Sequence, residues 1–326
     1  MQTLRQALDN IAECAAAKKS APPTLRLRCA SNGQRMIDIY NGTLGAAVGF
    51  EEDNFPRDEL SVDAATLMRV WQDGAVAKVD DKNLIVKSRR TTYRIPILDN
   101  ELFSCPDITP GGTQLSSEAR DAILLAAKFA SQNASHPWAT GVTLYKGKAI
   151  ATNNVAFVAV KCDTKLEGLI PPWAIAALRS EGDPPWVRID ARGVSFTYED
   201  STVIQSAPMA SSAPERLFTL LDSVSEGKVD IDPIIDLQKD MFRVKGKHVT
   251  LDPNAGVVIV STEDGINSET EIDFGVMGAA VRLQQPIFKL IIDHATHIGF
   301  QSAPDKLVFS SDKLPEFIGV AACLAQ

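Results

Sequence analysis

Hydrophobic and polar positions follow two spacings along the chain, one typical of helices and one typical of strands. Segments with the two spacings follow one another in a fixed order. In the clearest segment, a short apolar run at Leu60–Val62 precedes Asp63, a residue type that caps helices, and apolar residues then recur at helical spacing from Leu67 to Trp71. Three runs with strand-like alternation follow before residue 98, separated by turn residues. The pattern predicts a strand, a helix and a three-stranded meander.

The same order occurs three times. The repeats open at Leu60, Leu169 and Val281, at intervals of 109 and 112 residues, close to one third of the 326-residue chain. The segments between them repeat the plan, including a helix expected over residues 234–241. A period of this length predicts an α+β fold of three tandem domains, each made of two strand-helix-three-strand units. Segments rich in turn residues set the expected boundaries at 1–108, 109–222 and 223–326.

Composition narrows the class of protein. With 45% hydrophobic residues and 23% charged residues, the chain is typical of a soluble globular protein and not of a disordered or fibrous one. The net charge of −8 argues against a surface that binds nucleic acid everywhere, but it allows one basic face. No apolar window is long enough to span a membrane, and we find no signal peptide. The 5 cysteines are scattered and favour neither a disulfide framework nor a zinc site, so we expect a protein of the reducing cytoplasm.

Two short motifs are weak signals for ligand chemistry. Gly141–Lys148 superficially resembles a phosphate-binding loop, but the spacing is one residue too long and Ala149 follows the lysine. His294 and His297 lie three residues apart on a predicted helix, beside Asp293, but no third metal ligand is indicated. A packed His294 beside an exposed His297 is favoured instead. We therefore expect no catalytic residue, no metal and no cofactor.

Several stretches carry a family resemblance through their order and spacing. They are Val62–Leu67, Tyr93–Pro96 and Pro106–Asp107 in the first predicted domain, Thr140–Val142 and Ala151–Asn154 in the second, and Pro304–Phe309 in the third. Together they make the chain resemble, over essentially its whole length, a divergent member of the bacterial sliding clamps, the beta subunit of DNA polymerase III. The resemblance implies a processivity factor for DNA replication. Such a protein closes as a head-to-tail homodimeric ring around duplex DNA, with helices lining the hole and sheets outside.

A ring that slides needs contacts that are the same everywhere along DNA, which phosphates provide and base edges do not. Each of the six predicted helices carries or adjoins at least one basic residue that could face the hole. The candidate DNA-binding residues are Arg5, Lys18, Lys19, Arg69, Arg120, Lys128, Arg179, Lys239, Arg243 and Lys289. The alternative for any one of them is an ordinary solvated helix face. Because acidic residues share these helices, we expect a mildly positive lining, with enclosure and not affinity holding the ring on DNA.

The resemblance also implies a cleft between the second and third domains that binds a short hydrophobic peptide of DNA polymerase and clamp-loader subunits. The matching positions are Thr152, Asn153, Asn154, Val155, Phe157, Leu220, Leu221, Ile318, Gly319, Val320, Ala321, Ala322 and Leu324. Residues 319–324 are also consistent with a simple last strand, and both interpretations can hold. The chain has Ala321-Ala322-Cys323 instead of the family's Met-Pro-Met character, and Asn153-Asn154-Val155 instead of Asp-Gly-His. These changes imply a shallower pocket and favour a dedicated partner.

Two other classes of protein remain open from the residues alone. One is an enzyme of unknown class with repetitive α+β domains, although we identify no cluster of polar residues that would form its pocket. The other is an α+β repeat scaffold that binds only proteins, because repeats stack readily without closing into a ring.

Overall fold

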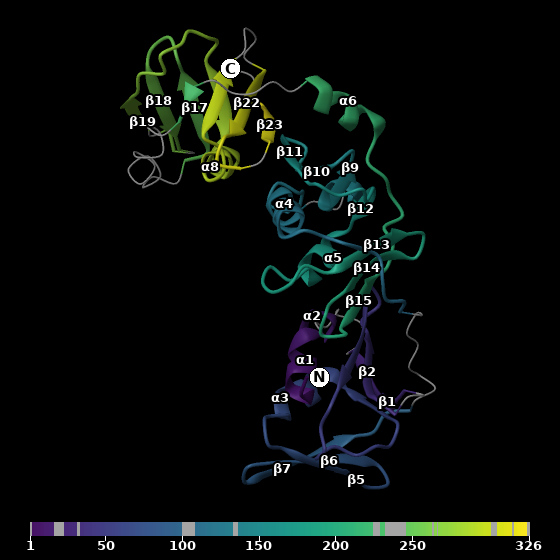
Figure 1. The fold of residues 1–326 in the computed structure, drawn as a ribbon. Helices are drawn as coiled ribbons and strands as arrows, with labels where there is room; N and C mark the ends of the chain where they lie inside the picture. The colour runs from purple at the N-terminus through teal and green to yellow at the C-terminus, as the bar shows by residue number, and fades with distance from the viewer. Residues whose placement is uncertain are drawn as a thin grey trace. The chain divides into compact units, whose positions relative to one another are not determined.

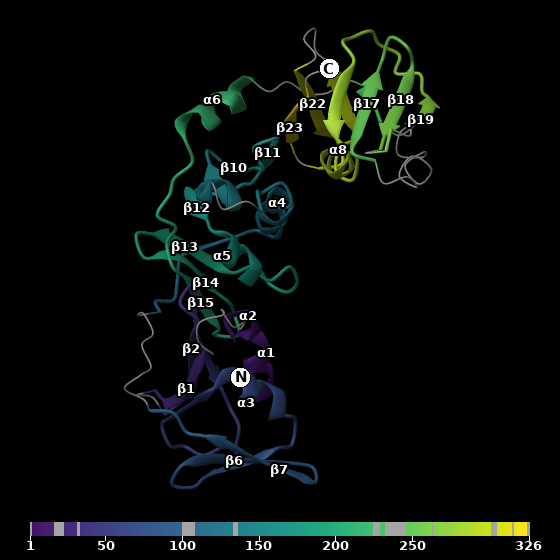
Figure 2. The same cartoon turned by 180° about the vertical axis from the view of Figure 1, so that it is seen from behind.

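The computed structural model describes most of the chain, in segments. These are residues 2–15, 23–30, 33–99, 108–132, 136–223, 229–231, 246–262, 264–265, 267–300, 305–314 and 316–324. The chain divides into two compact units, one made of Met1–Ser117 and Ile170–Ala210, the other of Glu118–Leu169 and Ser211–Gln326. Figure 1 labels many of their helices and strands, and Figure 2 shows the same ribbon from behind.

The first unit contains an 8-stranded antiparallel sheet with the order β4-β1-β2-β3-β15-β14-β13-β8. Its strands are β1 (Thr24–Cys29), β2 (Arg35–Tyr40), β3 (Leu44–Phe50), β4 (Leu60–Asp63), β8 (Thr113–Gln114), β13 (Trp186–Asp190), β14 (Gly193–Thr197) and β15 (Val203–Ser206). The meander β1-β2-β3 joins the meander β13-β14-β15 through antiparallel pairing of β3 with β15. A separate 3-stranded sheet holds β5 (Val76–Val79), β6 (Asn83–Ser88) and β7 (Thr91–Pro96).

Four short helices belong to this unit: α1 (Leu4–Asn10), α2 (Ala12–Ala15), α3 (Ala64–Val70) and α5 (Pro172–Ala177). The Thr3 side chain and Gln6 cap α1 reciprocally, and the Asp63 side chain accepts a hydrogen bond from the amide of Thr66 to cap α3. Helices α1 and α2 contact β3, and α5 contacts β15. Beneath them, a row of facing side chains crosses the large sheet, each at most 2% exposed: Val62, Leu25, Ile39, Ala46, Ile204, Phe196 and Val187.

The second unit repeats this plan. Its 8-stranded sheet has the order β12-β9-β10-β11-β23-β22-β21-β16, and a 4-stranded sheet has the order β19-β18-β17-β20. The strands are β9 (Val142–Tyr145), β10 (Lys148–Thr152), β11 (Ala156–Lys161), β12 (Gly168–Ile170), β16 (Val229–Asp230), β17 (His248–Asp252), β18 (Val257–Ser261), β19 (Asn267–Glu271), β20 (Val281–Gln284), β21 (His297–Phe300), β22 (Lys306–Ser311) and β23 (Phe317–Ala322). The helices are α4 (Ser117–Ala127), α6 (Glu215–Ser223) and α8 (Gln285–Ile292), with a 3₁₀ turn at Pro137–Thr140.

An aromatic cluster forms the core where β11 pairs with β23. The rings of Phe129 and Phe309 stack with their centroids 6.0 Å apart, and Phe317 lies 5.9 Å from Phe129. The ring of Phe309 also lies over Gly319, where an added Cβ would meet a ring carbon at 2.2 Å. Glycine is required at this position because the aromatic ring occupies the space that a side chain would need.

The predicted α+β class and the order of strand, helix and meander are confirmed wherever the residues are described. The helix expected to hold both His294 and His297 is shorter than predicted, because α8 ends at Ile292 and His297 begins β21. The strand expected within residues 319–324 is the end of β23. The helix expected over residues 234–241 lies outside the described residues. The three domain boundaries stay a prediction, because each large sheet contains strands from either side of one of them. None of the described helices is long and apolar enough to cross a membrane.

Candidate binding surfaces

The pairing of β11 with β23 creates an apolar surface on the face of the sheet opposite the aromatic core. Phe157 lies opposite Val320 and Ala159 lies opposite Ile318, and side chains alternate between faces along a strand. These residues join a buried cluster with Ile150, Leu217 and Val308. Partly buried apolar side chains surround that cluster, and we name them the α6 patch: Trp138, Tyr145, Ala213, Phe218, Leu220 and Ile318.

Helix α6 places three of its apolar side chains on this surface. Leu217 is 7% exposed within the cluster, and Phe218 and Leu220 pack against it while staying partly exposed. The ring of Phe218 stacks on the ring of Tyr145, with centroids 4.0 Å apart and an interplanar angle of 28°. The stack anchors the helix to the end of β9. The result is an apolar surface that is open enough to contact another molecule.

The turn between β10 and β11 is held by its own polar side chains. The Thr152 hydroxyl donates to the carbonyl of Ala156 at 2.8 Å, and the Asn153 side chain accepts from the amides of Val155 and Ala156 at 3.1 and 2.7 Å. Asn154 has a φ of 71°, a left-handed conformation that asparagine tolerates better than most residues. These residues therefore shape the turn, and the tail joins it because the Ala322 amide donates to the Val155 carbonyl at 2.8 Å.

Only part of the predicted cleft gathers in one place. Phe157, Leu220, Ile318 and Val320 share the apolar surface, whereas Gly319 faces the aromatic core and the Leu221 side chain lies outside the described part. The Leu324 amide donates to the Arg282 carbonyl at 2.7 Å. Sequence reasoning missed eight members of the surface that the structure adds: Trp138, Tyr145, Ile150, Ala159, Ala213, Leu217, Phe218 and Val308. The helical spacing of apolar residues after Pro214 is the signal that could have indicated Leu217 and Phe218.

Three of the candidate DNA-binding residues make contacts within the protein. Arg5 pairs with Asp9 at 2.6 Å and donates to the carbonyls of Met68 and Trp71 at the end of α3. Arg120 has a side chain only 9% exposed, beside Asp121 at 3.3 Å. The third, Arg179, belongs to a larger network.

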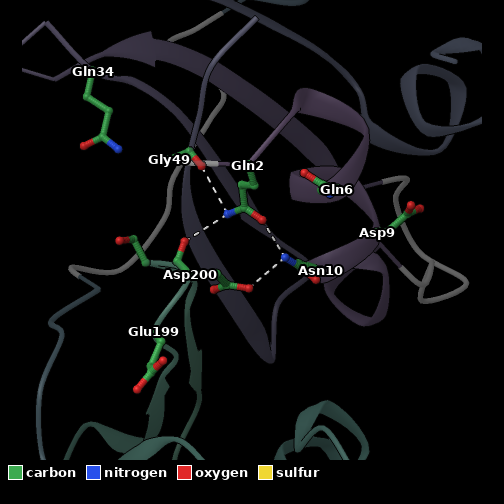
Figure 3. A pocket seen from close by; sticks show the side chains of 9 residues that line it. Gln2, Gln6, Asp9, Asn10, Gln34, Gly49, Glu199 and Asp200 are labelled. Atoms are coloured by element: carbon green, nitrogen blue, oxygen red, sulfur yellow. Dashed lines mark hydrogen bonds between the residues drawn. The ribbon is translucent and has the colours of Figure 1, made fainter. Parts of the chain in front are cut away.

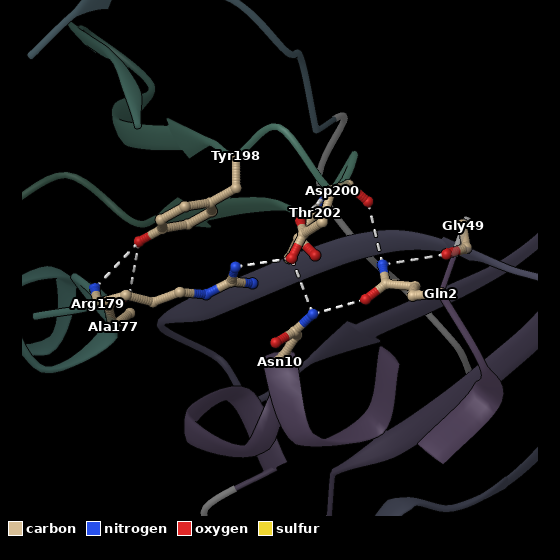
Figure 4. A network of polar contacts seen from close by, with 8 residues as sticks. All are labelled: Gln2, Asn10, Gly49, Ala177, Arg179, Tyr198, Asp200 and Thr202. Carbon is tan, nitrogen blue, oxygen red and sulfur yellow. Dashed lines mark hydrogen bonds and ion pairs between the residues drawn. The ribbon is translucent and has the colours of Figure 1, made fainter. Parts of the chain in front are cut away.

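Figure 4 shows this network, which connects α1, β3 and the turn between β14 and β15. The Arg179 guanidinium pairs with Asp200 at 2.7 Å and lies 3.9 Å from the centre of the Tyr198 ring. Asn10 donates to the Asp200 carboxylate at 2.9 Å and to the Gln2 side-chain oxygen at 2.6 Å. Gln2 in turn donates to the carbonyls of Gly49 and Asp200, each at 3.1 Å.

Hydrogen bonds within the network keep the Asp200 carboxylate ionised. Burial opposes its ionisation, but hydrogen bonds from Thr202 and Arg179 outweigh burial and hold the pKa of Asp200 below its usual value. The carboxylate is thus ionised at neutral pH and holds Arg179 in place. We conclude that Arg179 is engaged inside the protein, so its role in DNA binding stays a prediction.

A polar cavity of about 530 Å³ adjoins the network (Figure 3). It is lined by Gln2, Gln6, Asp9, Asn10, Gln34, Gly49, Glu199, Asp200 and Ser201. The lining offers amides, carboxylates and the hydroxyl of Ser201. Across the described residues, no group of three or more His, Cys, Asp or Glu side chains is placed to hold a metal ion.

The other candidate cations are exposed or lie outside the described part. Arg69, Lys128 and Lys289 are exposed, near the ends of α3, α4 and α8 respectively. Burial lowers the pKa of His294, and the charge of Lys128 lowers it further, so the end of α4 lies close to this histidine. Lys18, Lys19, Lys239 and Arg243 fall in segments that the structure does not describe.

Comparisons with known proteins define the class of fold. No family model and no curated protein sequence matches the chain. Among solved structures, the fold is that of the bacterial DNA polymerase III beta sliding clamps, matched over nearly the whole chain. The DNA polymerase III beta chain of Streptococcus pneumoniae matches with a TM-score of 0.79 and 15% identity, covering 99% of this chain and 97% of that one.

Two further clamps extend the comparison. The C. crescentus beta sliding clamp has a TM-score of 0.80 and 14% identity, covering 99% of this chain and 97% of that chain. The Helicobacter pylori beta clamp, solved with a DNA ligase peptide, has a TM-score of 0.76 and 12% identity, covering 99% of this chain and 98% of that chain. The fold of this protein is therefore that of a beta clamp, at a sequence identity of 12 to 15% to these three clamps.

Proposed function

We propose that the protein is a DNA sliding clamp, a non-enzymatic and cytoplasmic processivity factor. It encircles duplex DNA as a head-to-tail homodimer of chains with three domains each, and it tethers a DNA polymerase. The observation that carries the proposal is the full-length agreement in fold with beta clamps, from the first described residues to the last strand. A clamp acts by enclosing DNA and not through a catalytic motif, so agreement in fold is the support that the sequence and the structure can give. Fold alone does not assign function, which is why the proposal is tested on DNA.

Strand pairing supports closure by a second copy of the chain. Within the chain, each large sheet forms where the third strands of two meanders meet, β3 with β15 and β11 with β23. The third strands of the remaining meanders are β7 and β19, and both lie at sheet edges in the described part. We assign β7 of one copy to pair antiparallel with β19 of the other. Two such joints close a ring, and each joint uses different surfaces on the two copies.

The α6 patch supports tethering through a peptide. The Helicobacter pylori clamp with the same fold has been solved with a DNA ligase peptide. In this chain the patch presents the partly exposed aromatic side chains of Trp138, Tyr145 and Phe218. Aromatic anchors of this kind contribute strongly to binding in peptide sites. The proposed partners are DNA polymerase and clamp-loader subunits that carry a short hydrophobic segment.

Retention on DNA of different topology tests the proposal. After loading onto nicked circular plasmid, the protein is expected to co-elute with the DNA in gel filtration. Cutting the plasmid once with a restriction enzyme is expected to release it, because a ring slides off a free end. Equal retention on circular and linear DNA would contradict enclosure, and a chain that stays monomeric at every concentration would contradict the ring.

A further inference from the structure

The small sheet of β5, β6 and β7, labelled in Figure 1, has one face toward the core of the first unit and one face toward solvent. Side chains alternate between the faces of a strand, and cross-strand neighbours share a face. Leu84, Val86 and Ile95 are each at most 1% exposed and form the core face. The opposite, outer face carries Val76, Lys78, Asn83, Ile85, Lys87, Thr92, Arg94 and Pro96. All of these outer side chains except Asn83 and Ile85 are exposed in the single chain.

Positive charge gathers on this outer face and in the turn at its end. We name this surface the β6 patch and define it by six residues: Val76, Lys78, Ile85, Lys87, Arg89 and Arg90. In the ladder Lys87 lies beside Val76 and Lys78 lies beside Ile85, so each lysine has an apolar neighbour. Arg89 and Arg90 form the turn between β6 and β7. Arg94 shares the outer face, but it lies on the edge strand assigned to the second copy and is not counted in the patch.

The cations of the β6 patch differ from those on the large sheet of the same unit. The arginines on the outer face of the large sheet pair with carboxylates: Arg26 with Glu59, Arg28 with Asp38, and Arg188 with Asp190. Among the residues that the structure describes, none of the four patch cations forms an ion pair. The exposed carboxylates of Asp73, Asp80 and Asp81, which flank β5 in the sequence, are among the described groups that leave them unpaired. On a chain of net charge −8, the patch is a local positive surface that attracts anionic groups.

The turn between β6 and β7 carries its two charges in a strained conformation. Ser88 pairs with Thr91, so Arg89 and Arg90 are the two central residues of a tight hairpin turn. Arg89 has a φ of 51°, in the left-handed region that favours glycine. Residues held in sparsely populated backbone conformations cluster at functional sites. The turn is therefore a second observation, independent of the ion pairs, that supports a role for the patch.

The composition of the β6 patch distinguishes between two kinds of anionic ligand. Surfaces that bind single-stranded nucleic acid combine cations with aromatic side chains on which bases stack. Tyr93, the only aromatic residue in the three strands, lies beside Val86 on the core face. The patch offers Val76 instead, which is 48% exposed, with Ile85 in the next row of the ladder. Lysines beside aliphatic side chains fit an acidic peptide with an apolar anchor better than they fit a nucleic acid.

We propose that the β6 patch docks an acidic segment of a partner protein, in which Asp or Glu residues flank an apolar side chain. The carboxylates pair with the patch cations, and the apolar side chain contacts Val76 and Ile85. Alternate side chains of an extended segment are roughly 7 Å apart, the same spacing that separates Val76 from Lys78 along β5. The site is distinct from the α6 patch, which belongs to the other unit and binds a hydrophobic segment. Pairing of β7 with a second copy leaves the faces of β5 and β6 open, so the site does not depend on closure of the ring.

Fluorescence anisotropy with the full chain and a labelled synthetic peptide tests the proposal. The probe is a peptide of about 12 residues in which Glu alternates with Ser and two central Ser are replaced by Leu, and its binding should weaken as salt is raised. Lys78→Gln/Lys87→Gln should lower the affinity about tenfold, because two carboxylates lose their partners. Lys82→Gln/Lys313→Gln removes the same charge from two exposed lysines outside the patch and should bind the peptide as wild type does. Circular dichroism and thermal unfolding check that each variant is folded.

A second peptide and a DNA probe separate a built site from a surface that attracts any anion. The same peptide with Ser in place of Leu should bind wild type more weakly, and Val76→Ser should abolish the difference between the two peptides. Equal binding of both peptides to wild type, an equal loss in the two double variants, or no binding at low salt would each overturn the proposal. Tighter binding of oligo(dT) than of the peptide would overturn it in favour of a nucleic-acid surface. A chain that binds the peptide at the patch but is not retained on circular DNA would keep this site and lose the clamp function.

Discussion

At the scale of single residues, Gly319 is the position where packing leaves least freedom. A Cβ there would meet the Phe309 ring at 2.2 Å and the Phe157 carbonyl at 2.7 Å, and both groups are buried. Gly319→Ala is expected to lower the free energy of unfolding by about 1–3 kcal/mol, the usual cost of overpacking a core. Gly49→Ala is the matched control, because its nearest neighbour is the end of the flexible Gln34 side chain. Urea unfolding of both variants measures the difference, and equal losses would contradict the account.

Asp200 gives a prediction that depends on pH. Its pKa is lowered in the folded chain, so its contribution to stability is present above the unfolded pKa of about 3.9 and is lost as the pH falls through the lower folded value. Asp200→Asn removes this contribution. The difference in melting temperature between wild type and Asp200→Asn should therefore be largest near neutral pH and shrink below about pH 4.

The control for Asp200 is a charge pair of ordinary exposure. Lys161 and Glu316 lie 3.1 Å apart with side chains 40% and 60% exposed, so Glu316→Gln should leave the melting temperature nearly unchanged, because solvent screens an exposed ion pair. If Asp200→Asn has an equally small effect at neutral pH, the network does not brace the first unit.

Features of single residues could be predicted from the sequence where the interacting partner is a near neighbour in the chain. The Asp63 cap was predictable because its partner is three residues away. The roles of Arg5 and Arg179 were not predictable, because the sequence pattern around a basic residue on a helix is the same whether its side chain faces solvent or binds a group distant in sequence. Arg5 reaches Met68, 63 positions away, and Asn10 reaches Asp200, 190 positions away. Contacts across such separations leave no trace in a local pattern.

At the scale of elements, α6 links the sheet to the proposed peptide site. Phe218→Ala removes the ring stacked on Tyr145 and part of the apolar surface, so affinity for a hydrophobic clamp-binding peptide should fall about tenfold or more. Thr219→Ala, an exposed position on the same helix, is the control and should bind normally. Fluorescence polarisation with labelled peptides from polymerase subunits measures both. Unchanged affinity of the folded Phe218→Ala variant would show that the α6 patch is not part of the peptide site.

The sequence predicted where the helices and strands lie better than it predicted which strands pair with one another. Periodicity identified the meanders because alternation depends only on the strand itself. Periodicity did not reveal that β3 pairs with β15, or that β11 pairs with β23. Pairing between strands that are distant in sequence depends on the register and on which edges are free. The expected cleft was incomplete for the same reason: Phe157 and Val320 meet through that pairing, and Tyr145 packs against the same cluster from the end of β9.

At the scale of the whole molecule, affinity for DNA and enclosure of DNA contribute separately to how the protein loads onto DNA and stays there. One experiment distinguishes the two contributions. Lys128→Glu/Lys289→Glu reverses two exposed charges, one directly after α4 and one on α8, that are candidates for phosphate contact. Loading onto nicked circular DNA should become weaker, and its dependence on the logarithm of salt concentration should become shallower by about one unit for each lost contact. Clamps that have already closed should leave circular DNA at the wild-type rate, because escape requires the joint to open and not a phosphate contact to break. Lys313→Glu, an exposed lysine outside the helices, should change neither quantity. Faster escape of the double variant from circular DNA would mean that phosphate contacts, and not the closed ring, hold the protein in place.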